Sequence, residues 1–315
     1  MRSRVVQVAK IKQNDYSVLE MRDNHASRTA EYMAFFRALE TMEPPARRLF
    51  SDPFALPLLS GPLKVFARMA QLPMVSGAVH GILDAGWPYT RSSGVVRTRA
   101  IDDLVCDAIR SGIRQLVLLG AGFDSRGYRL KEAQDITVFE VDHPATQQLK
   151  RERMNAIIRE MPANVRFVAV DFERDDLEAG LMAAGFDAAR PAIVVWEGVV
   201  SYLTEPAVKA SFALLSSLLA PESSLIFTYM HKGAVDGSHS FPGARRWRSW
   251  VSFSGEPFIF GFDPGSLAET LTAFGFRLAR DVSTEEIAQR YCPPLSRKEP
   301  GSQAYRVAVA LRDED

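Results

Sequence analysis

The stretch from Gln115 to Asp124 constrains the fold of this chain more than any other. Residues 115–119 are almost all apolar, and Gly120-Ala121-Gly122 follows them directly. An apolar run of this length is typical of a strand that is buried on both faces of a sheet. The two glycines allow a sharp turn and let a ligand approach bare backbone. The pattern predicts a loop that binds a nucleoside cofactor after a first central strand, or else a tight turn that binds nothing.

The residues after the glycines indicate which cofactor would fit. A dinucleotide-binding loop has a third glycine three residues after the second, but Ser125 stands at that position. Asp124 adds a carboxylate that would repel a pyrophosphate and attract an ammonium group. A cofactor with one nucleoside and an α-amino-acid end, such as S-adenosylmethionine, therefore fits better than a nicotinamide dinucleotide.

The rest of the chain alternates between strand and helix patterns. Apolar runs predict strands at 137–141, 165–170, 192–196 and 224–229, and two final strands at 276–280 and 304–311. Helical spacing and cap residues predict helices at about 144–157, 204–219 and 263–274. Short connections between alternating strands and helices predict a doubly wound, mostly parallel α/β sheet.

Acidic residues stand at the ends of three of these strands, where ligands of open α/β sheets bind. Asp142 lies 22 residues after Gly120, a spacing that suits a carboxylate that binds ribose hydroxyls. A helix cap before residues 143–144 is the alternative. Asp171 could accept a hydrogen bond from an adenine amino group, with Phe172 beside the base, or could lie in a solvated turn. Glu197 ends the strand at 192–196.

Two segments lie outside this alternation. Residues 1–90 predict a helical cap, which either packs on the main domain or covers the active site as a lid, and residues 91–315 then form the main domain. A helix expected to start near Arg97 would place this arginine near the glycine loop, where it could bind a carboxylate. Surface charge is the plainer interpretation of Arg97.

Residues 231–258 form an insertion after the fifth strand that is rich in glycine and aromatic residues. Three arginines and two tryptophans alternate within residues 245–250, namely Arg245, Arg246, Trp247, Arg248 and Trp250. They could bind an anionic aromatic molecule, because long insertions of this kind are usually functional. A basic amphipathic face that covers the core is the alternative.

Composition limits the classes of partner. The chain has 315 residues, formal net charge zero, and only two cysteines, without metal-ligand spacing. Zero net charge gives no reason to expect nucleic acid or a membrane as partner, and no apolar run reaches the roughly 18 residues of a membrane helix. Two isolated thiols suit a reducing cytoplasm. We expect a cytoplasmic enzyme without a metal, and the sequence leaves its oligomeric state open.

Several motifs, taken together, resemble the leucine carboxyl methyltransferase family, including bacterial enzymes similar to the tetracenomycin carboxyl-methylating enzyme. The motifs are Ser27–Ala30, Leu49–Pro53, Arg97–Asp102, Leu119–Leu130, Phe139–Pro144, Asp171-Phe172 and Glu197–Leu203. The resemblance covers about residues 24–311. It implies a Rossmann-like class I methyltransferase fold with seven strands, which ends in an antiparallel hairpin.

The resemblance also implies roles for individual residues. The cofactor-binding set would comprise Arg97, Gly120, Ala121, Gly122, Asp142, Asp171, Phe172 and Glu197. In that set Arg97 would bind the methionine carboxylate, Glu197 the methionine ammonium group, and Asp171 with the backbone of Phe172 the adenine. Many relatives have leucine where Phe172 stands, which changes the wall of the adenine pocket. Arg28 and Arg37 are both candidates for a second cation near the carboxylate.

The expected reaction is methyl transfer to an oxygen of a small molecule. A carboxylate acceptor is already ionised at pH 7 and needs no general base, whereas a phenol would need one, and His231 is the candidate. The predicted acceptor site consists of Tyr202, Tyr229, His231, Arg245, Arg246 and Trp247. Two other classes stay open from the residues alone, a nicotinamide-dependent oxidoreductase and a cofactor-binding protein without catalysis.

Overall fold

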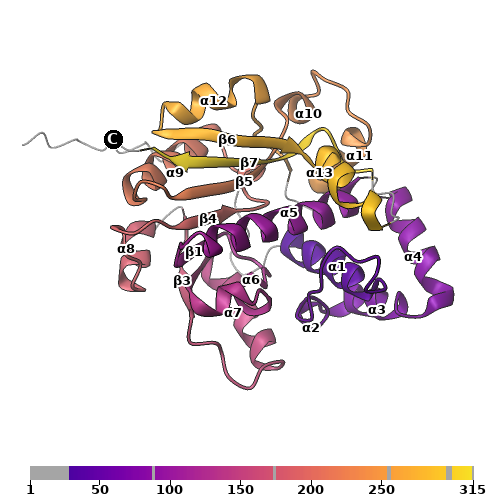
Figure 1. Ribbon diagram of the computed structural model, residues 1–315. Coiled ribbons are helices and arrows are strands. Elements are labelled where there is room, and N and C mark those ends of the chain that lie inside the picture. Colours follow the sequence, from indigo (N-terminus) through magenta and orange to yellow (C-terminus); the bar gives the residue numbers. More distant parts are fainter. Residues whose placement is uncertain (1–27, 87–88, 173–174, 254–256, 296–299, 314–315) are drawn as a thin grey trace, which may run out of the picture.

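A single seven-stranded mixed sheet forms the centre of the computed structural model (Figure 1). The structure describes residues 28–86, 89–172, 175–253, 257–295 and 300–313. The sheet has the order β3-β2-β1-β4-β5-β7-β6, and its strands are β1 (Gln115–Leu119), β2 (Thr137–Asp142), β3 (Val165–Ala169), β4 (Ile193–Trp196), β5 (Ser224–Met230), β6 (Phe276–Ser283) and β7 (Tyr305–Arg312). The first five strands pair in parallel, and β7 is antiparallel to β5 and β6. The predicted doubly wound α/β fold and its final hairpin are confirmed.

Helices cover both faces of this sheet. Before β1 lie α1 (Arg28–Met42), α2 (Ala55–Leu58), α3 (Gly61–Met69), α4 (Pro73–Gly86) and α5 (Thr90–Arg110). Between β1 and β5 lie α6 (Arg126–Arg129), α7 (Pro144–Asn155), α8 (Leu177–Ala183) and α9 (Glu205–Leu218), with short 3-10 turns at Glu132–Asp135 and Val200–Tyr202. After β5 lie α10 (Lys232–Asp236), α11 (Ala244–Phe253), α12 (Pro264–Thr272) and α13 (Thr284–Tyr291), with a 3-10 turn at Pro293–Leu295.

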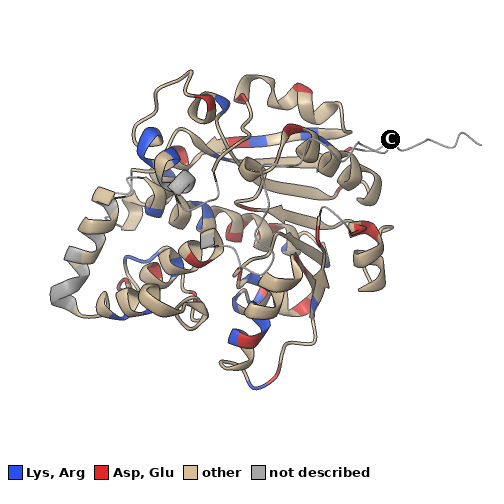
Figure 2. Cartoon of the chain, turned by 180° about the vertical axis from the view of Figure 1, so that it is seen from behind, with Lys and Arg blue, Asp and Glu red and all other residues tan. Residues whose placement is uncertain are grey.

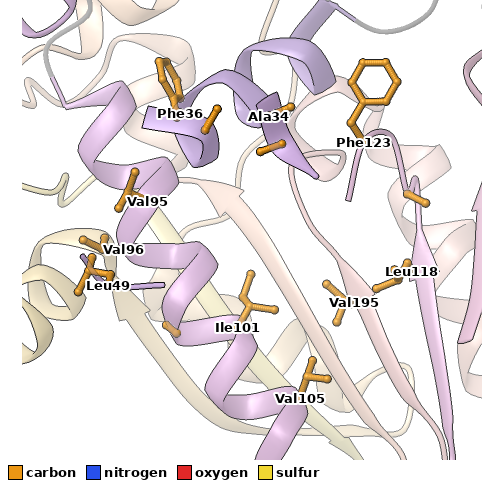
Figure 3. Close-up of a cluster of buried hydrophobic side chains, with 14 of the residues drawn as sticks. Ala34, Phe36, Leu49, Val95, Val96, Ile101, Val105, Leu118, Phe123 and Val195 are labelled. Carbon is orange, nitrogen blue, oxygen red and sulfur yellow. The ribbon is translucent and has the colours of Figure 1, made fainter. Parts of the chain in front are cut away.

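The continuous apolar run of β1 is explained by burial on both faces. Leu116 and Leu118 point into a core that contains residues of α1, α5, α7 and α13 (Figure 3). Val117 and Leu119 point into a second core, which contains residues of α8, α9 and α12. Successive side chains of a strand point to opposite faces, so a strand between two helical layers must be apolar at every position. The loop at residues 120–122 is thereby held at the end of a rigid central strand.

The N-terminal helices share the first of these cores with the sheet. Phe36 of α1 and Val95 of α5 both belong to the cluster that reaches Val195 of β4 (Figure 3). The helical character predicted for residues 28–90 is therefore present, although the predicted cap residue Ser27 lies outside the described residues. The division into domains at residue 90 stays a prediction.

Helix α5 begins at Thr90, seven residues before the predicted start, and this corrects the position of Arg97. Arg97 lies in the middle of a 21-residue helix rather than at its first turn. The early turns carry small polar residues that are buried, such as Ser93, whose hydroxyl bonds that of Thr284 at 2.9 Å. An apolar stripe was the signal for a helix, so a buried polar start gave no such signal.

Helix α13 was not predicted either, although its start carries a recognisable signature. Ser283 and Glu286 form a capping box, in which the serine hydroxyl accepts from the Glu286 backbone N–H at 3.2 Å and the glutamate accepts from the Ser283 N–H at 2.8 Å. This reciprocal pair satisfies two backbone donors that a helix start leaves free. The helix packs against α5 and contributes Ile287 to the first core.

The insertion at residues 231–258 contains two helices, α10 and α11, and residues 254–256 lie outside the described part. In Figure 2 basic residues mark α11, which carries Arg245, Arg246 and Arg248 and no acidic residue. Trp247 of α11 is 7% exposed and packs in a small cluster with Met230 and Tyr305. Of the described helices, none combines the length and the apolar character that a bilayer crossing requires.

Candidate active site

The glycine loop approaches its neighbours too closely for any side chain. A Cβ atom on Gly120 would lie 2.6 Å from Cγ2 of Val199, and one on Gly122 would lie 3.0 Å from Cβ of Ala30. Both glycines also have positive φ, +71° and +46°, which non-glycine residues rarely adopt. The backbone N–H groups of Gly120 and Ala121 both donate to the carbonyl oxygen of Val141, at 2.9 Å. The loop is therefore a bare backbone surface that is fixed against the end of β2.

Asp142 ends β2 directly beside this loop, as predicted. One of its carboxylate oxygens accepts from the Gly122 N–H, and the other accepts from the His143 N–H at 2.7 Å. Burial raises the pKa of Asp142 even though both hydrogen bonds favour the ionised form. Each oxygen of a carboxylate has a second acceptor position, so Asp142 retains the capacity to bind two hydroxyl groups.

Arg97 and Glu197 meet at the end of β4, although they are 100 residues apart in the chain. Nε of Arg97 lies 2.7 Å from Oε1 of Glu197, and Nη1 of Arg126 lies 2.7 Å from Oε2. Burial alone would raise the pKa of Glu197, but Arg126 and Arg97 outweigh it and hold the pKa below its ordinary value. The carboxylate of Glu197 and the guanidinium of Arg97 thus lie side by side, and further partners hold each of them in position.

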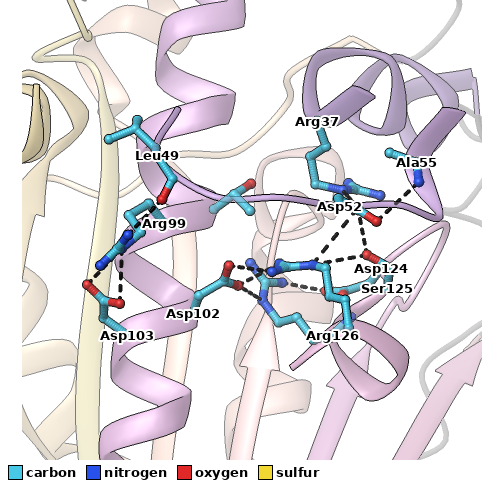
Figure 4. A network of polar contacts seen from close by, with 12 residues as sticks. Arg37, Leu49, Asp52, Ala55, Arg99, Asp102, Asp103, Asp124, Ser125 and Arg126 are labelled. Carbon is cyan, nitrogen blue, oxygen red and sulfur yellow. Dashed lines mark hydrogen bonds and ion pairs between the residues drawn. The ribbon is translucent and has the colours of Figure 1, made fainter. Parts of the chain in front are cut away.

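A buried network of alternating charges continues below the loop (Figure 4). Arg126 also donates to Asp102 of α5, Nε to Oδ1 at 2.8 Å, and Arg129 binds the same carboxylate with both terminal nitrogens at 2.6 and 2.7 Å. Asp52 accepts from Nε of Arg37 at 2.8 Å and from the Ser125 hydroxyl at 2.6 Å. We call these four arginines and four carboxylates the ion network: Arg37, Arg97, Arg126, Arg129, Asp52, Asp102, Asp124 and Glu197.

Asp124, which was expected to attract an ammonium group, has a cation of its own within the network. Its carboxylate pairs with Nη1 of Arg126 and accepts from the Arg126 backbone N–H at 2.7 Å. Burial would raise the pKa of Asp124, but the attraction of Arg126 and of more distant cations lowers it from 3.8 to about 2. Asp124 is therefore ionised at neutral pH and helps to place Arg126.

Of the two candidates for a second cofactor-binding cation, Arg28 and Arg37, the structure describes the side chain of Arg37 only. Nη2 of Arg37 donates to the carbonyl oxygen of Phe123 at 2.5 Å, so this arginine supports the loop from below. The side chain of Arg28 lies outside the described part of the chain. Sequence reasoning did not single out Arg126, although it stands within the Leu119–Leu130 motif, two residues after Asp124.

Asp171 and Phe172 follow β3, next to the end of β2. The Asp171 backbone N–H donates to Oδ2 of Asp175 at 2.8 Å, which shapes a tight turn. Phe172 is 47% exposed. Its ring therefore has a free face at the position that the resemblance assigns to adenine.

Aromatic rings of the insertion gather near the end of β5. Tyr202 packs against Phe258 with ring centroids 5.3 Å apart, and Trp247 packs against both Phe258 at 6.0 Å and Tyr305 at 5.4 Å. Tyr305 connects this aromatic group to the ion network, because its hydroxyl accepts from Nη1 of Arg97. Two of the predicted acceptor-site residues, Tyr202 and Trp247, thus lie in one group.

Tyr229 does not belong to this group, and the prediction for it is wrong. Its side chain is fully buried in the second core, and its hydroxyl donates to Oδ2 of Asp281 at 2.8 Å. Neighbouring residues of a strand point to opposite faces, and it is Thr228, the residue before, whose hydroxyl lies 3.0 Å from that of Tyr305. A small molecule at the strand ends could not reach Tyr229 without unpacking the core.

The arginines of α11 do not converge on one point. Arg245 is exposed, Nη1 of Arg246 donates to the carbonyl oxygen of Ala85 at 3.1 Å, and Nη1 of Arg248 donates to that of Val235 at 3.3 Å. Arg246 thus connects α11 to α4, and Arg248 connects it to α10. The side chain of Trp250 lies outside the described part of the chain.

His231 lies at the start of α10, and its ring is half-buried against His239 and Phe241, with centroids at 5.6 and 4.9 Å. Its Nδ1 accepts from the Gly233 backbone N–H at 3.0 Å. In the neutral ring the proton is then on Nε2, so the only outward nitrogen is a donor. Burial lowers the pKa of His231, which favours this neutral form at pH 7.

Comparison with known proteins agrees with these features. The profile of the leucine carboxyl methyltransferase family matches residues 30–216. A protein of Mycolicibacterium smegmatis named as an S-adenosyl-L-methionine-dependent methyltransferase is 34% identical over 291 residues, which cover 90% of this chain and 93% of that protein. A similarly named protein of Mycobacterium marinum is 35% identical over 224 residues, 70% of each chain.

Two solved structures share the fold at low identity. A DUF574-family protein of Streptomyces avermitilis superposes with a TM-score of 0.59 at 14% identity, over 92% of this chain and 99% of that chain. A Thermobifida fusca protein named for methyltransferase activity superposes with a TM-score of 0.58 at 18% identity, over 83% and 93%. At such identities the likeness concerns the fold.

The charge of Asp124 predicts a specific dependence of stability on pH. Because the pKa of Asp124 in the folded protein lies below its ordinary value, its ionised form stabilises the fold above about pH 4, and this contribution is lost as the pH falls toward 2. We expect Asp124→Asn to lower the free energy of unfolding by about 2 kcal/mol at pH 7. The difference from wild type should shrink between pH 4 and pH 3, as measured by urea denaturation.

The control is Asp107→Asn, which removes an exposed pair with Arg110 and should change stability by less than about 0.5 kcal/mol. A difference between wild type and Asp124→Asn that stays constant down to pH 3 would contradict the assignment.

Proposed function

The chain belongs to the leucine carboxyl methyltransferase family and is an S-adenosylmethionine-dependent methyltransferase, and from this we propose that it methylates a carboxylate of a small aromatic molecule. The observation that carries the assignment of the cofactor site is the contact between Arg97 and Glu197 at the end of β4, 2.7 Å apart. The amino-acid end of the cofactor carries one positive and one negative charge. A fixed arginine beside a fixed carboxylate is complementary to both.

The described residues fit such a cofactor along the whole edge of the sheet. Gly120 and Gly122, on either side of Ala121, offer bare backbone where a side chain would collide with Val199 or Ala30. Arg97 would bind the carboxylate of the cofactor, and Glu197 its ammonium group. Asp142 has two free acceptor positions for ribose hydroxyls, and the half-buried Asp171 with the exposed ring of Phe172 would hold the adenine.

The reaction requires little acid–base chemistry from the protein. When bound, the cofactor supplies an electrophilic methyl group. A carboxylate acceptor has an ordinary pKa of about 4 and is ionised at pH 7, so the residues of this chain need only orient one of its oxygens and exclude water from it. Tyr202, Phe258 and Trp247 form an aromatic group that suits a flat apolar acceptor. The insertion that carries two of them would act as the lid.

The alternative acceptor is a phenol, with His231 as the general base. The geometry of His231 favours the carboxylate instead, because its Nδ1 is already engaged by the Gly233 N–H. A base must offer a lone pair to the proton that it removes, and the outward Nε2 of neutral His231 carries a proton. His231 is better placed to donate a hydrogen bond to an acceptor carboxylate, and exposed Arg245 or Arg246 would attract that anion to the insertion.

Cofactor binding can be measured without knowing the acceptor. We expect isothermal titration calorimetry to show binding of S-adenosylhomocysteine and no binding of NAD. Glu197→Gln should weaken that binding about 10- to 100-fold, because a hydrogen bond between charged groups contributes about 1.5–3 kcal/mol. The control Glu205→Gln removes an exposed pair with Lys209 and should bind as wild type does. Binding of NAD in place of S-adenosylhomocysteine would refute the assignment of the cofactor site.

The acceptor class is decided by the chemistry of the product. Incubation with radiolabelled S-adenosylmethionine and a panel of small aromatic carboxylic acids and phenols should label a carboxylic acid. The product should be a methyl ester, which mild base hydrolyses, whereas a phenol ether resists base. His231→Ala should leave the pH profile of kcat unchanged for the carboxylate. A base-stable product whose formation is lost in His231→Ala would support the phenol reaction and overturn the carboxylate proposal.

A further inference from the structure

Tyr305 occupies a position between the cofactor site and the insertion, and it has no role in the functions discussed so far. It begins β7 and is 4% exposed. Its hydroxyl accepts from Nη1 of Arg97 and lies 3.0 Å from Oγ1 of Thr228. The Arg97 guanidinium also lies over the tyrosine ring, 4.8 Å from its centroid. Tyr305 therefore fixes Arg97 both by a hydrogen bond and by contact with its ring.

The same tyrosine is connected through Thr228 to the backbone that carries Glu197. Thr228, its second hydroxyl partner, accepts from the Gly198 backbone N–H at 2.8 Å. Gly198 directly follows Glu197 and has φ of +72°. The cation and the anion of the predicted cofactor site are thus both positioned from one hydroxyl group, directly for Arg97 and through Thr228 for the residue after Glu197.

The Tyr305 ring also packs against α11. Trp247 packs on it with ring centroids 5.4 Å apart, and the two rings belong to one cluster with Met230 and Ala304. Trp247 is the buried anchor of α11, whose neighbouring arginines are turned toward α4 and α10. A change in the position of Tyr305 would therefore alter the packing of α11, which belongs to the predicted lid over the acceptor.

We propose that Tyr305 is a positioning residue that holds Arg97 ready for the carboxylate of the cofactor and couples binding of the cofactor to the packing of α11 through Trp247. This inference rests on the proposed function of the same site. Coupling of this kind is reciprocal, so an acceptor held under α11 strengthens cofactor binding by the factor by which the cofactor strengthens acceptor binding.

The contacts of Arg97 explain why Tyr305 matters more than its other partners. Nε is bound to Glu197, Nη1 to Tyr305, and Nη2 lies 3.1 Å from Sδ of Met33. A thioether is a weak acceptor, so Nη2 is the nitrogen that a cofactor carboxylate can take over. The hydroxyl of Tyr305 and the carboxylate of Glu197 then keep the guanidinium plane in place. If the Tyr305 hydroxyl is removed, Nη1 of Arg97 loses the hydrogen-bond acceptor that β7 provides.

The test compares Tyr305→Phe with Tyr229→Phe, both measured by calorimetry with S-adenosylhomocysteine and by thermal unfolding. Each variant loses one buried tyrosine hydroxyl from the same sheet, but the hydroxyl of Tyr229 binds Asp281 on the opposite face. We expect Tyr305→Phe to weaken binding about tenfold, as for other buried hydrogen bonds to charged groups. Tyr229→Phe should bind S-adenosylhomocysteine with the affinity of the wild-type protein, even if its Tm falls as far as that of Tyr305→Phe.

The coupling to α11 is tested by tryptophan fluorescence. Addition of S-adenosylhomocysteine should change the emission of the wild-type protein, and Trp247→Phe should remove most of that change. Trp196→Phe, a substitution in the second core, should retain it. In Tyr305→Phe saturated with S-adenosylhomocysteine, the change should be much reduced, because Trp247 then packs on a ring that has lost its hydrogen bond to Arg97.

The outcomes separate this inference from the function on which it rests. If the wild-type protein does not bind S-adenosylhomocysteine, the proposed function fails and the inference fails with it. If the wild-type protein binds but Tyr305→Phe binds with equal affinity, the positioning role is overturned alone. An emission change that is equally large in wild type and saturated Tyr305→Phe would overturn the coupling.

Discussion

The contact between Glu197 and its two arginines is the interaction on which the site depends. Removing charges from water is costly, and a buried carboxylate with a single partner seldom recovers that cost. Glu197 has two cations, Arg97 and Arg126, and Arg126 is in turn bound by Asp102 and Asp124. Because every buried charge of the ion network has a counter-charge, the network can persist below the glycine loop and still present a cation and an anion at the strand ends.

This network also connects the N-terminal helices to the sheet domain. Asp52 and Arg37 come from the N-terminal region, Asp102 comes from α5, and the arginines of α6 join them (Figure 4). Phe36 and Val95 make the same connection through the apolar core (Figure 3). The glycine loop is thus held between apolar packing and buried charge, and a cofactor would find its binding groups already in place.

Much of this could be predicted from sequence, because the signals were local. An apolar strand, two glycines and an acid at the end of the next strand identify the loop and Asp142 without knowledge of the fold. The partners of Arg97 are different, since Glu197 and Tyr305 are 100 and 208 residues away. The local pattern left Arg97 open between a carboxylate ligand and surface charge and placed Glu197 at a strand end, and the family resemblance gave both their roles, whereas Tyr305 had no motif to indicate it.

The error for Tyr229 has a physical origin. Strand β5 is buried at every position, so its apolar pattern does not reveal which face carries the site. Aromatic character favoured Tyr229, but alternation places Thr228 toward Tyr305 and Tyr229 toward Phe262. The start of α5 was misplaced for a related reason, because its buried turns carry serine and threonine rather than the apolar stripe expected of a packed helix.

The most direct measurement is a crystal structure of the protein with S-adenosylhomocysteine. The amino-acid end of the ligand should lie against Arg97 and Glu197, with its carboxylate on the arginine. Its ribose should lie at Asp142, beside the glycine loop. A ligand bound elsewhere would contradict the assignment of these charges to the cofactor. The assignment would also be contradicted if the ligand bound at this edge but its amino-acid end pointed away from Arg97 and Glu197, with their contact unchanged.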